Sequence, residues 1–163
     1  MLPAGFPSSV APAYAHYAGW GMVGSVFASA GGVLGMQSLL LAVGVGAPGA
    51  LPLAAALNWV LKDGLGQLGG VLYAALVSTR FDTDPRRWRM LSAMASDAAT
   101  ALEVCAPLAP GAFLPIAALA NVGKNISWLS ASATRAGLHQ ALASRGNLAD
   151  VTGKAGSQSI AAR

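Results

Sequence analysis

The sequence predicts an all-α fold, a multi-helical bundle of about four long apolar helices that is expected to lie in a membrane. The first sixty-one residues contain no Asp, Glu, Lys or Arg, and this uncharged run ends at Lys62 and Asp63. The whole chain is 10% charged and 55% hydrophobic, with a mean hydropathy of +0.56. Soluble domains place charge at about a quarter of their positions. No segment alternates polar and apolar residues for long, which argues against strands.

Prolines and glycines set the expected limits of the first two helices. Three prolines keep residues 1–12 as an extended lead-in, and a helix is expected over residues 14–43. At 1.5 Å per residue this helix would be ~45 Å long, which is enough to cross a bilayer. Glycines and a proline at residues 44–49 break it, and a second helix is expected over residues 51–79.

The second half of the chain predicts two further long helices. A polar loop over residues 80–85 precedes the third helix, which is expected to begin near Pro85 with Asp84 as its N-cap. A proline-rich break follows, and the fourth helix is expected over residues 112–145. The third helix is the weakest candidate for a membrane span, because it is short and holds two acidic residues.

The chain is predicted to form a single domain over residues 1–163. Its polar tail, residues 146–163, is expected to form a short amphipathic helix with a frayed end. Four arginines fall between Arg80 and Arg89, and the positive-inside tendency places them on the cytoplasm-like side of the membrane. Both ends of the chain are then expected on the same side.

Small residues recur at every fourth position on the first two predicted helices. Such stripes let helix backbones approach closely and favour helix association in lipid. A general bias towards alanine and glycine is the alternative explanation for single positions. The stripes consist of Gly24, Ala28 and Gly32 on the first helix, and of Gly66, Gly70, Ala74 and Ser78 on the second. We expect both helices to contact a neighbour in the manner of GxxxG packing.

Ionisable residues inside the predicted helices form the candidate site. A charge at the centre of a bilayer costs ~2.5–3.5 kcal/mol, so it normally pairs and faces protein or water. Amide side chains accompany these charges at helical spacing, including Asn125 beside Lys124. The candidate residues for a substrate or ion path are Asn58, Lys62, Asp63, Gln67, Asp97, Glu103, Asn121 and Lys124.

Two interpretations of these residues stay open, and the second is favoured. They could line a path for a proton, an ion or a small metabolite, or they could be structural ion pairs that lock helices together. A cavity at Lys62 and Asp63 would indicate transport. Mutual contact of the two residues in a packed seam would indicate bracing.

A dinucleotide-binding motif is present by letter but not by context. Gly44-x-Gly46-x-x-Gly49, followed by Asp63, matches the fingerprint of nucleotide-binding folds. Asp63 lies in helical sequence, however, and no alternation of strands and helices follows. Nucleotide binding is therefore not expected.

Other chemistry is also not expected. Cys105 is the single cysteine, so the chain forms no internal disulfide, and its apolar neighbours predict a buried inert thiol. His16 and His139 are too far apart to suggest metal ligands, and neither has an evident partner. The arginines are accompanied only by Trp88, which argues against nucleic-acid binding. We expect no metal, no cofactor and no enzymatic activity.

Short motifs follow one another in order along nearly the whole chain. They include Gly5-Phe6-Pro7, Trp59-x-Leu61-Lys62-Asp63-Gly64, Ala133-Thr134-Arg135-Ala136, Asn147-x-Ala149-Asp150-Val151 and Lys154-x-Gly156-Ser157-Gln158. Together these motifs resemble those of the root UVB sensitive family. The motif residues singled out by this resemblance are Gly64, Arg135, Asp150, Lys154, Gly156, Ser157 and Gln158.

The resemblance implies a multi-helical membrane or membrane-associated protein, longer than this chain at both ends and without an assigned activity. It also implies links to vitamin B6 balance, to plastids, and to light and seedling-growth responses. We expect transport of a small metabolite or ion, with a non-enzymatic membrane scaffold as the alternative. A third possibility is a soluble module whose apolar helices bury in a larger protein. The expected partners are membrane lipid and a family member or other protein, and the expected location is a plastid or other organelle membrane.

Overall fold

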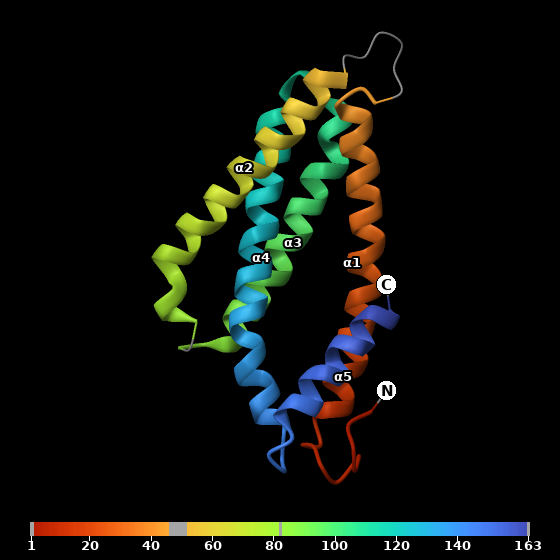
Figure 1. Ribbon diagram of the computed structural model, residues 1–163, viewed down its shortest axis with the longest axis vertical. Helices are drawn as coiled ribbons and strands as arrows, with labels where there is room; N and C mark the ends of the chain where they lie inside the picture. Colours follow the sequence, from red (N-terminus) through yellow and green to blue (C-terminus); the bar gives the residue numbers. More distant parts are fainter. Residues whose placement is uncertain (1, 46–51, 82, 163) are drawn as a thin grey trace. The chain divides into compact units, whose positions relative to one another are not determined.

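The computed structural model describes residues 2–45, 52–81 and 83–162, and these ranges fold into helices (Figure 1). The α-helices are α1 (Tyr14–Ala42), α2 (Pro52–Val77), α3 (Pro85–Cys105), α4 (Phe113–Leu142) and α5 (Leu148–Ala161). Three single 3₁₀ turns join them, namely η1 (Ser78–Arg80), η2 (Ala106–Leu108) and η3 (Pro110–Ala112). Within the described residues, β-structure is limited to one isolated bridge between Val10 and Ala143. The predicted all-α fold is confirmed.

The end of α1 is closed by a glycine in the left-handed conformation. Gly44 has φ of +83° and lies two residues beyond Ala42, the last residue of the helix. Its N–H donates to the carbonyl of Leu41 at 3.1 Å, and the N–H of Val45 donates to the carbonyl of Leu40 at 3.0 Å. This arrangement satisfies carbonyls that the helix end would otherwise leave without partners. The remainder of the predicted break, residues 46–49, lies outside the described residues.

The start of α3 and the polar tail also form as predicted. The side chain of Asp84 accepts a hydrogen bond from the backbone N–H of Arg87 at 3.1 Å, and Pro85 occupies the first helical position. Both features favour helix initiation there. The tail contains the 14-residue helix α5.

The chain divides into two compact units, one of residues 1–31 with 135–163 and one of residues 32–134. In the first unit, α5 and the lead-in contribute to an apolar cluster whose most buried members are Tyr14 and Val151. Val10, Ala18 and Leu142 complete this cluster. The first unit therefore has a small core of its own.

The second unit is built around close contacts of α4 with α2. A Cβ atom added to Gly66 would lie 2.5 Å from Nδ2 of Asn121, and one added to Gly69 would lie 2.5 Å from Cγ2 of Val122. Gly70 faces Asn125 in the same way, at 2.9 Å. The predicted role of the second stripe is thus confirmed for its glycines. Farther along the chain, Ala74 of α2 is half-buried and Ser78, the first residue of η1, is exposed.

The stripe predicted on the first helix does not make the expected contact. A Cβ atom added to Gly24 or to Gly32 would meet nothing within 4 Å in the described part of the chain. The close approach occurs instead at Gly35, which abuts the carboxylate of Glu103 on α3. Gly35 is three residues beyond Gly32, so the two lie near the same side of α1. Of the two, Gly35 is the one that faces α3.

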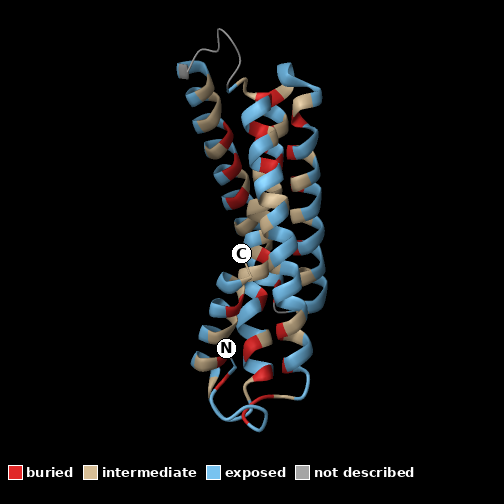
Figure 2. Ribbon diagram, turned by 90° about the vertical axis from the view of Figure 1, so that its right-hand side faces the viewer, coloured by how far each residue is buried: buried red, intermediate tan, exposed pale blue. Residues whose placement is uncertain are grey.

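Membrane-spanning character is limited to one helix by length and composition. Among the described residues, α1 alone is long and apolar enough to cross a bilayer, and 17% of its most apolar window is buried. Figure 2 shows that the exposed colour covers much of each long helix, whereas buried residues form narrow stripes. Large apolar side chains therefore lie on the surface of this structure in unusual number.

Candidate functional site

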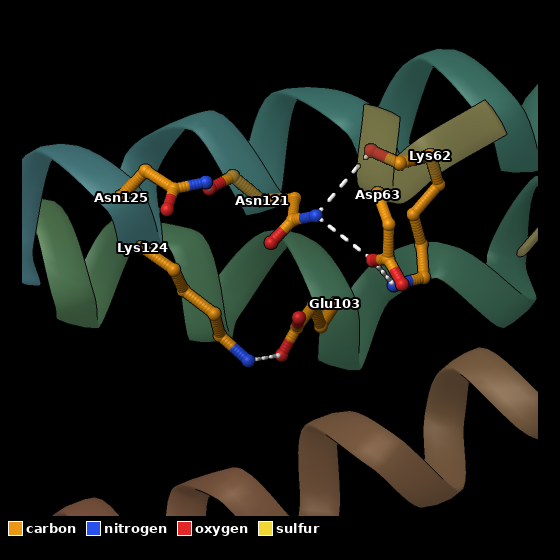
Figure 3. A network of polar contacts seen from close by, with 6 residues as sticks. All are labelled: Lys62, Asp63, Glu103, Asn121, Lys124 and Asn125. Carbon is orange, nitrogen blue, oxygen red and sulfur yellow. Dashed lines mark hydrogen bonds and ion pairs between the residues drawn. The ribbon is translucent and has the colours of Figure 1, made fainter. Parts of the chain in front are cut away.

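Lys62 and Asp63 contact each other at the seam between α2 and α4 (Figure 3). Nζ of Lys62 lies 2.5 Å from Oδ1 of Asp63. Consecutive residues of a helix do not face each other, so the pair forms because the long lysine side chain bends towards its neighbour. The amine also lies 4.4 Å from the ring centroid of Trp59, in the geometry of a cation–π contact. Lys62 is thereby buried with its charge compensated.

Asn121 of α4 joins this pair to the fourth helix. Its Nδ2 donates to Oδ1 of Asp63 at 3.0 Å and to the backbone carbonyl of Lys62 at 3.3 Å. The amide can reach both acceptors because Gly66, one turn along α2, has no side chain to keep the helices apart. Asn125 donates in turn to the carbonyl of Asn121 at 3.0 Å. One amide thus links α4 to the charged pair of α2.

A second ion pair joins α3 to α4. Nζ of Lys124 donates to Oε2 of Glu103 at 2.6 Å. The Glu103 side chain is only 5% exposed, and the Lys124 side chain is 38% exposed. Gly35 of α1 lies against the same carboxylate. Glu103 therefore occupies a point where three helices meet.

Three of the predicted site residues lie outside this charged group. Gln67 and Asp97 are exposed, and Asn58 is half-buried on α2, one turn before Lys62. In the described structure, Gln67 and Asp97 therefore lie outside the interior that the eight residues are expected to line. Gln67 is four residues from Asp63 and shares the side of α2 on which that carboxylate is 50% exposed. Asp97 is six residues from Glu103, so helical rotation directs it away from that buried carboxylate.

The cysteine and one of the histidines also differ from expectation. Cys105 is exposed at the end of α3, because the face that it occupies is not the one that packs on α4. His139 is buried, with Nε2 3.2 Å from the hydroxyl of Tyr17 and Nδ1 3.0 Å from Oγ1 of Thr152. These partners are distant in sequence, so spacing gave no signal for them. Among the described residues, no cluster of three or more His, Cys, Asp and Glu could hold a metal ion.

The family-motif residues fall into structural and exposed groups. Asp150 accepts a hydrogen bond from the backbone N–H of Ala4 at 2.7 Å, and Gln158 is buried with Nε2 3.4 Å from the hydroxyl of Tyr14. Both tie α5 to the lead-in and α1 within the first unit. Lys154 is half-buried. The exposed motif residues are Gly64, Arg135, Gly156 and Ser157.

The chain matches a known protein family along its full length. Residues 1–163 match the family described as the vitamin B6 photo-protection and homoeostasis domain. The chain belongs to this root UVB sensitive family. The predicted resemblance is confirmed, and with it the family's tie to vitamin B6 homoeostasis and the UVB response. No solved structure matches the chain significantly.

Named relatives come from a plant and from an amoeba. Protein root UVB sensitive 3 of Arabidopsis thaliana is 32% identical over 97% of this chain and 36% of its own length. Root UVB sensitive 2 of the same plant, named chloroplastic, is 36% identical over 94% of this chain and 35% of its own. RUS family member 1 of Dictyostelium discoideum is 32% identical over 99% of this chain and 31% of its own. The chain thus spans about a third of the length of these relatives.

Proposed function

We propose that this domain is a membrane-embedded helical bundle that supports vitamin B6 balance without catalysing a reaction, by holding a protein partner at the membrane. The proposal rests on α2, where charged and small residues are buried and large apolar residues are exposed. Lys62, Gly66 and Gly70 of this helix are buried. Its exposed large apolar residues are Leu53, Leu57, Val60, Leu61, Leu65, Leu68, Val71, Leu72 and Leu76. A helix on the surface of a soluble protein has the opposite arrangement.

The free-energy cost of that face in water supports a lipid environment. Burying one large aliphatic side chain is worth ~1.5–3 kcal/mol relative to leaving it in water. The nine exposed side chains of α2 therefore forgo on the order of 10 kcal/mol in water. That amount is comparable with the whole stability of a domain, about 5–15 kcal/mol. Contact with acyl chains removes this cost.

One hydrogen bond and one ion pair between helices fit a bracing role in such a bundle. Helices in lipid are held together by close packing and hydrogen bonds, because the surrounding acyl chains are as apolar as the side chains. Asn121 bonds Asp63 across the seam between α2 and α4, and Lys124 pairs with Glu103 between α3 and α4. Both links cross the contact between two helices, as braces do.

The exposed acidic residue on α3 supports the proposal that a protein partner packs on this helix. Asp97 lies in the middle of α3 and is exposed. A carboxylate that faces lipid is costly, so this face of α3 is expected to contact protein or water. We propose that the remainder of a full-length family member, or a second family member, packs against it. The proposed location is a plastid or other organelle membrane, since one relative is named chloroplastic.

Transport of a small metabolite or ion is the second candidate. It is supported by the open sides of both ion pairs, because the side chains of Asp63 and Lys124 are 50% and 38% exposed. A proton or a small anion could reach these groups. The family's tie to vitamin B6 makes pyridoxal and its 5′-phosphate the first substrates to test.

Alkaline carbonate washing of membranes that contain the chain tests the proposed embedding. We expect the chain to stay in the membrane fraction, because carbonate removes proteins that bind only at the surface. Release into the supernatant would favour a soluble module that buries its apolar helices in a larger protein.

A flux measurement separates the scaffold from the transporter. Purified chain in proteoliposomes is assayed for uptake of protons, pyridoxal and pyridoxal 5′-phosphate, with Asp63→Asn as the variant. A scaffold gives the flux of protein-free vesicles in every case. Flux that the wild type supports and that Asp63→Asn abolishes, with the helix content unchanged by circular dichroism, would establish transport instead. Loss of a co-purified protein when the exposed face of α3 is changed by Asp97→Arg would support the scaffold.

A further inference from the structure

The connection between α2 and α3 places several arginines at the surface. Arg80, Arg86 and Arg87 are exposed, and Arg89 is half-buried. Arg89 reaches α4, where Nη1 donates to the carbonyl of Ala131 at 3.3 Å. We call these four residues the arginine cluster. Among the described residues, the ion pairs are those of Lys62 and Lys124, so no member of the cluster is paired with a described carboxylate.

The cluster also lies where helix electrostatics favour an anion. Arg86, Arg87 and Arg89 are in the first two turns of α3, and the first turn contains no acidic residue. The N-terminus of a helix carries partial positive charge, so arginines there repel the helix dipole and an anion relieves that repulsion. Asp84 is committed to its capping hydrogen bond with the backbone of Arg87. The sequence places one further acid in this connection, Asp82, which lies outside the described residues.

Aromatic side chains from α2, the connection and α3 pack together beside the cluster. The rings of Phe81 and Trp88 lie 5.1 Å apart between centroids, and those of Tyr73 and Phe81 lie 6.3 Å apart. Nε1 of Trp88 donates to the carbonyl of Arg80 at 2.8 Å. Tryptophan and tyrosine are enriched at the interface between membrane and water, where an apolar ring and a polar group are both accommodated.

Apolar side chains begin directly beside the cluster on both helices. On α2, Leu76 and Leu72 are exposed about one and two turns before Arg80, respectively. On α3, Met90 and Met94 are exposed and follow Arg86 at intervals of four residues, which places the three on one face. The surface therefore changes from cationic to apolar within a few turns on both helices, as at the edge of a bilayer.

We propose that the arginine cluster binds the phosphate groups of anionic phospholipids at one surface of the membrane. This inference rests on the proposed membrane placement of the domain. The charge of the cluster complements an anionic leaflet, and the adjacent apolar residues reach the acyl chains of the same lipids. Each exposed arginine near such a surface strengthens binding about fivefold at low salt, and the effect weakens as salt screens the charges.

The test uses the chain purified in an uncharged detergent, with binding to mixed micelles measured by thermophoresis. Micelles contain either phosphatidylglycerol or phosphatidylcholine. The variant combines Arg80→Gln, Arg86→Gln and Arg87→Gln. Its matched control removes three positive charges from the other unit, through Arg135→Gln, Arg145→Gln and Lys154→Gln. A third variant replaces the same three arginines of the cluster by lysine.

We expect the glutamine variant to bind phosphatidylglycerol roughly a hundredfold more weakly than the wild type, in line with three lost surface arginines. The control and the lysine variant should stay within a few fold of the wild type in phosphatidylglycerol. All four proteins should bind phosphatidylcholine equally and more weakly than the wild type binds phosphatidylglycerol, because only the headgroup charge differs. The proposal would be overturned if the glutamine variant and its control lost the same affinity for phosphatidylglycerol. It would also be overturned if the wild type bound inorganic phosphate as tightly as it binds phosphatidylglycerol. Affinity for an RNA oligonucleotide with none for phosphatidylglycerol would overturn it too. Micelle binding does not require that helices span a bilayer, so this result is independent of the carbonate wash.

Discussion

Lys124 of α4 and Glu103 of α3 form an ion pair in which the buried partner is the acid and the more accessible partner is the base. Because the two side chains differ in burial, their removal should lower the free energy of unfolding by different amounts. Removal of Lys124 leaves a buried carboxylate without its counter-ion, whereas removal of Glu103 leaves an amine that can still reach solvent. The same pair should therefore respond unequally to the loss of either member.

A double-mutant cycle on this pair tests the asymmetry. We expect Lys124→Met to lower the free energy of unfolding by about 2–3 kcal/mol, less than for a fully buried pair because Lys124 is partly solvated. Glu103→Gln should cost less, about 1 kcal/mol. The double variant should recover part of the loss of Lys124→Met. Chemical denaturation in detergent measures all four proteins, and strictly additive effects would show that the pair does not couple the helices.

Gly35 should be intolerant of a side chain because its face of α1 adjoins Glu103. An alanine there would displace the carboxylate and disturb its bond to Lys124. We expect Gly35→Ala to destabilise the protein by about 1–3 kcal/mol, as overpacking does. Gly32→Ala, three residues earlier on the same helix, meets open space in the described structure and should be neutral or stabilising. Equal melting temperatures for the two variants would contradict this contact.

Gly66 and Gly64 form a second matched pair on α2. A Cβ atom at Gly66 would lie 2.7 Å from Cβ of Asn121, whereas one at Gly64 meets nothing within 4 Å in the described residues. Gly66→Ala should separate α2 from α4 and cost about 1–3 kcal/mol. Gly64→Ala should raise stability by roughly 0.5–1 kcal/mol through its helix propensity. Thermal melts followed by circular dichroism would refute the seam if both variants shifted in the same direction.

Cys105 should react with a water-soluble maleimide without unfolding, because it is exposed beside the η2 turn. Mass spectrometry of the native protein should show complete single labelling at a rate close to that in denaturant. A rate that rises by orders of magnitude on unfolding would instead show that the thiol is buried.

The sequence predicts the helices of this fold better than their contacts. Pro85, Asp84 and Gly44 act through local rules, and the structure places helix ends where those rules put them. Lys62 and Asp63 are adjacent in sequence, so their contact can be predicted from the sequence. The hydrogen bond from Asn121 to Asp63 cannot, because it depends on how α2 packs on α4. Spacing along one helix cannot show which face meets a neighbour.

That same limit explains the positions where the sequence misleads. Asp97 is predicted to lie inside because it is an ionisable residue within a predicted helix, yet it is exposed on α3 and lies on another side from Glu103. Gly35 lies outside the four-residue stripe and makes the contact that Gly32 was expected to make. His139 contacts Tyr17 and Thr152 through the packing of α4 on α1 and α5, which the spacing of these residues in the sequence does not indicate. Tertiary packing, which a single sequence does not encode locally, decides each of these cases.

The proposed membrane placement predicts that the apolar face of α2 lies in lipid, and the environment of this face can be measured directly. Spin labels are placed singly at Leu61, Leu68 and Leu72, in a chain reconstituted in bilayers with Cys105→Ala, and their relaxation by oxygen and by a water-soluble nickel complex is measured. If this face lies in lipid, oxygen should relax every label strongly and the nickel complex should have little effect. Strong relaxation by the nickel complex at all three positions would place the face in water and contradict the membrane-embedded domain.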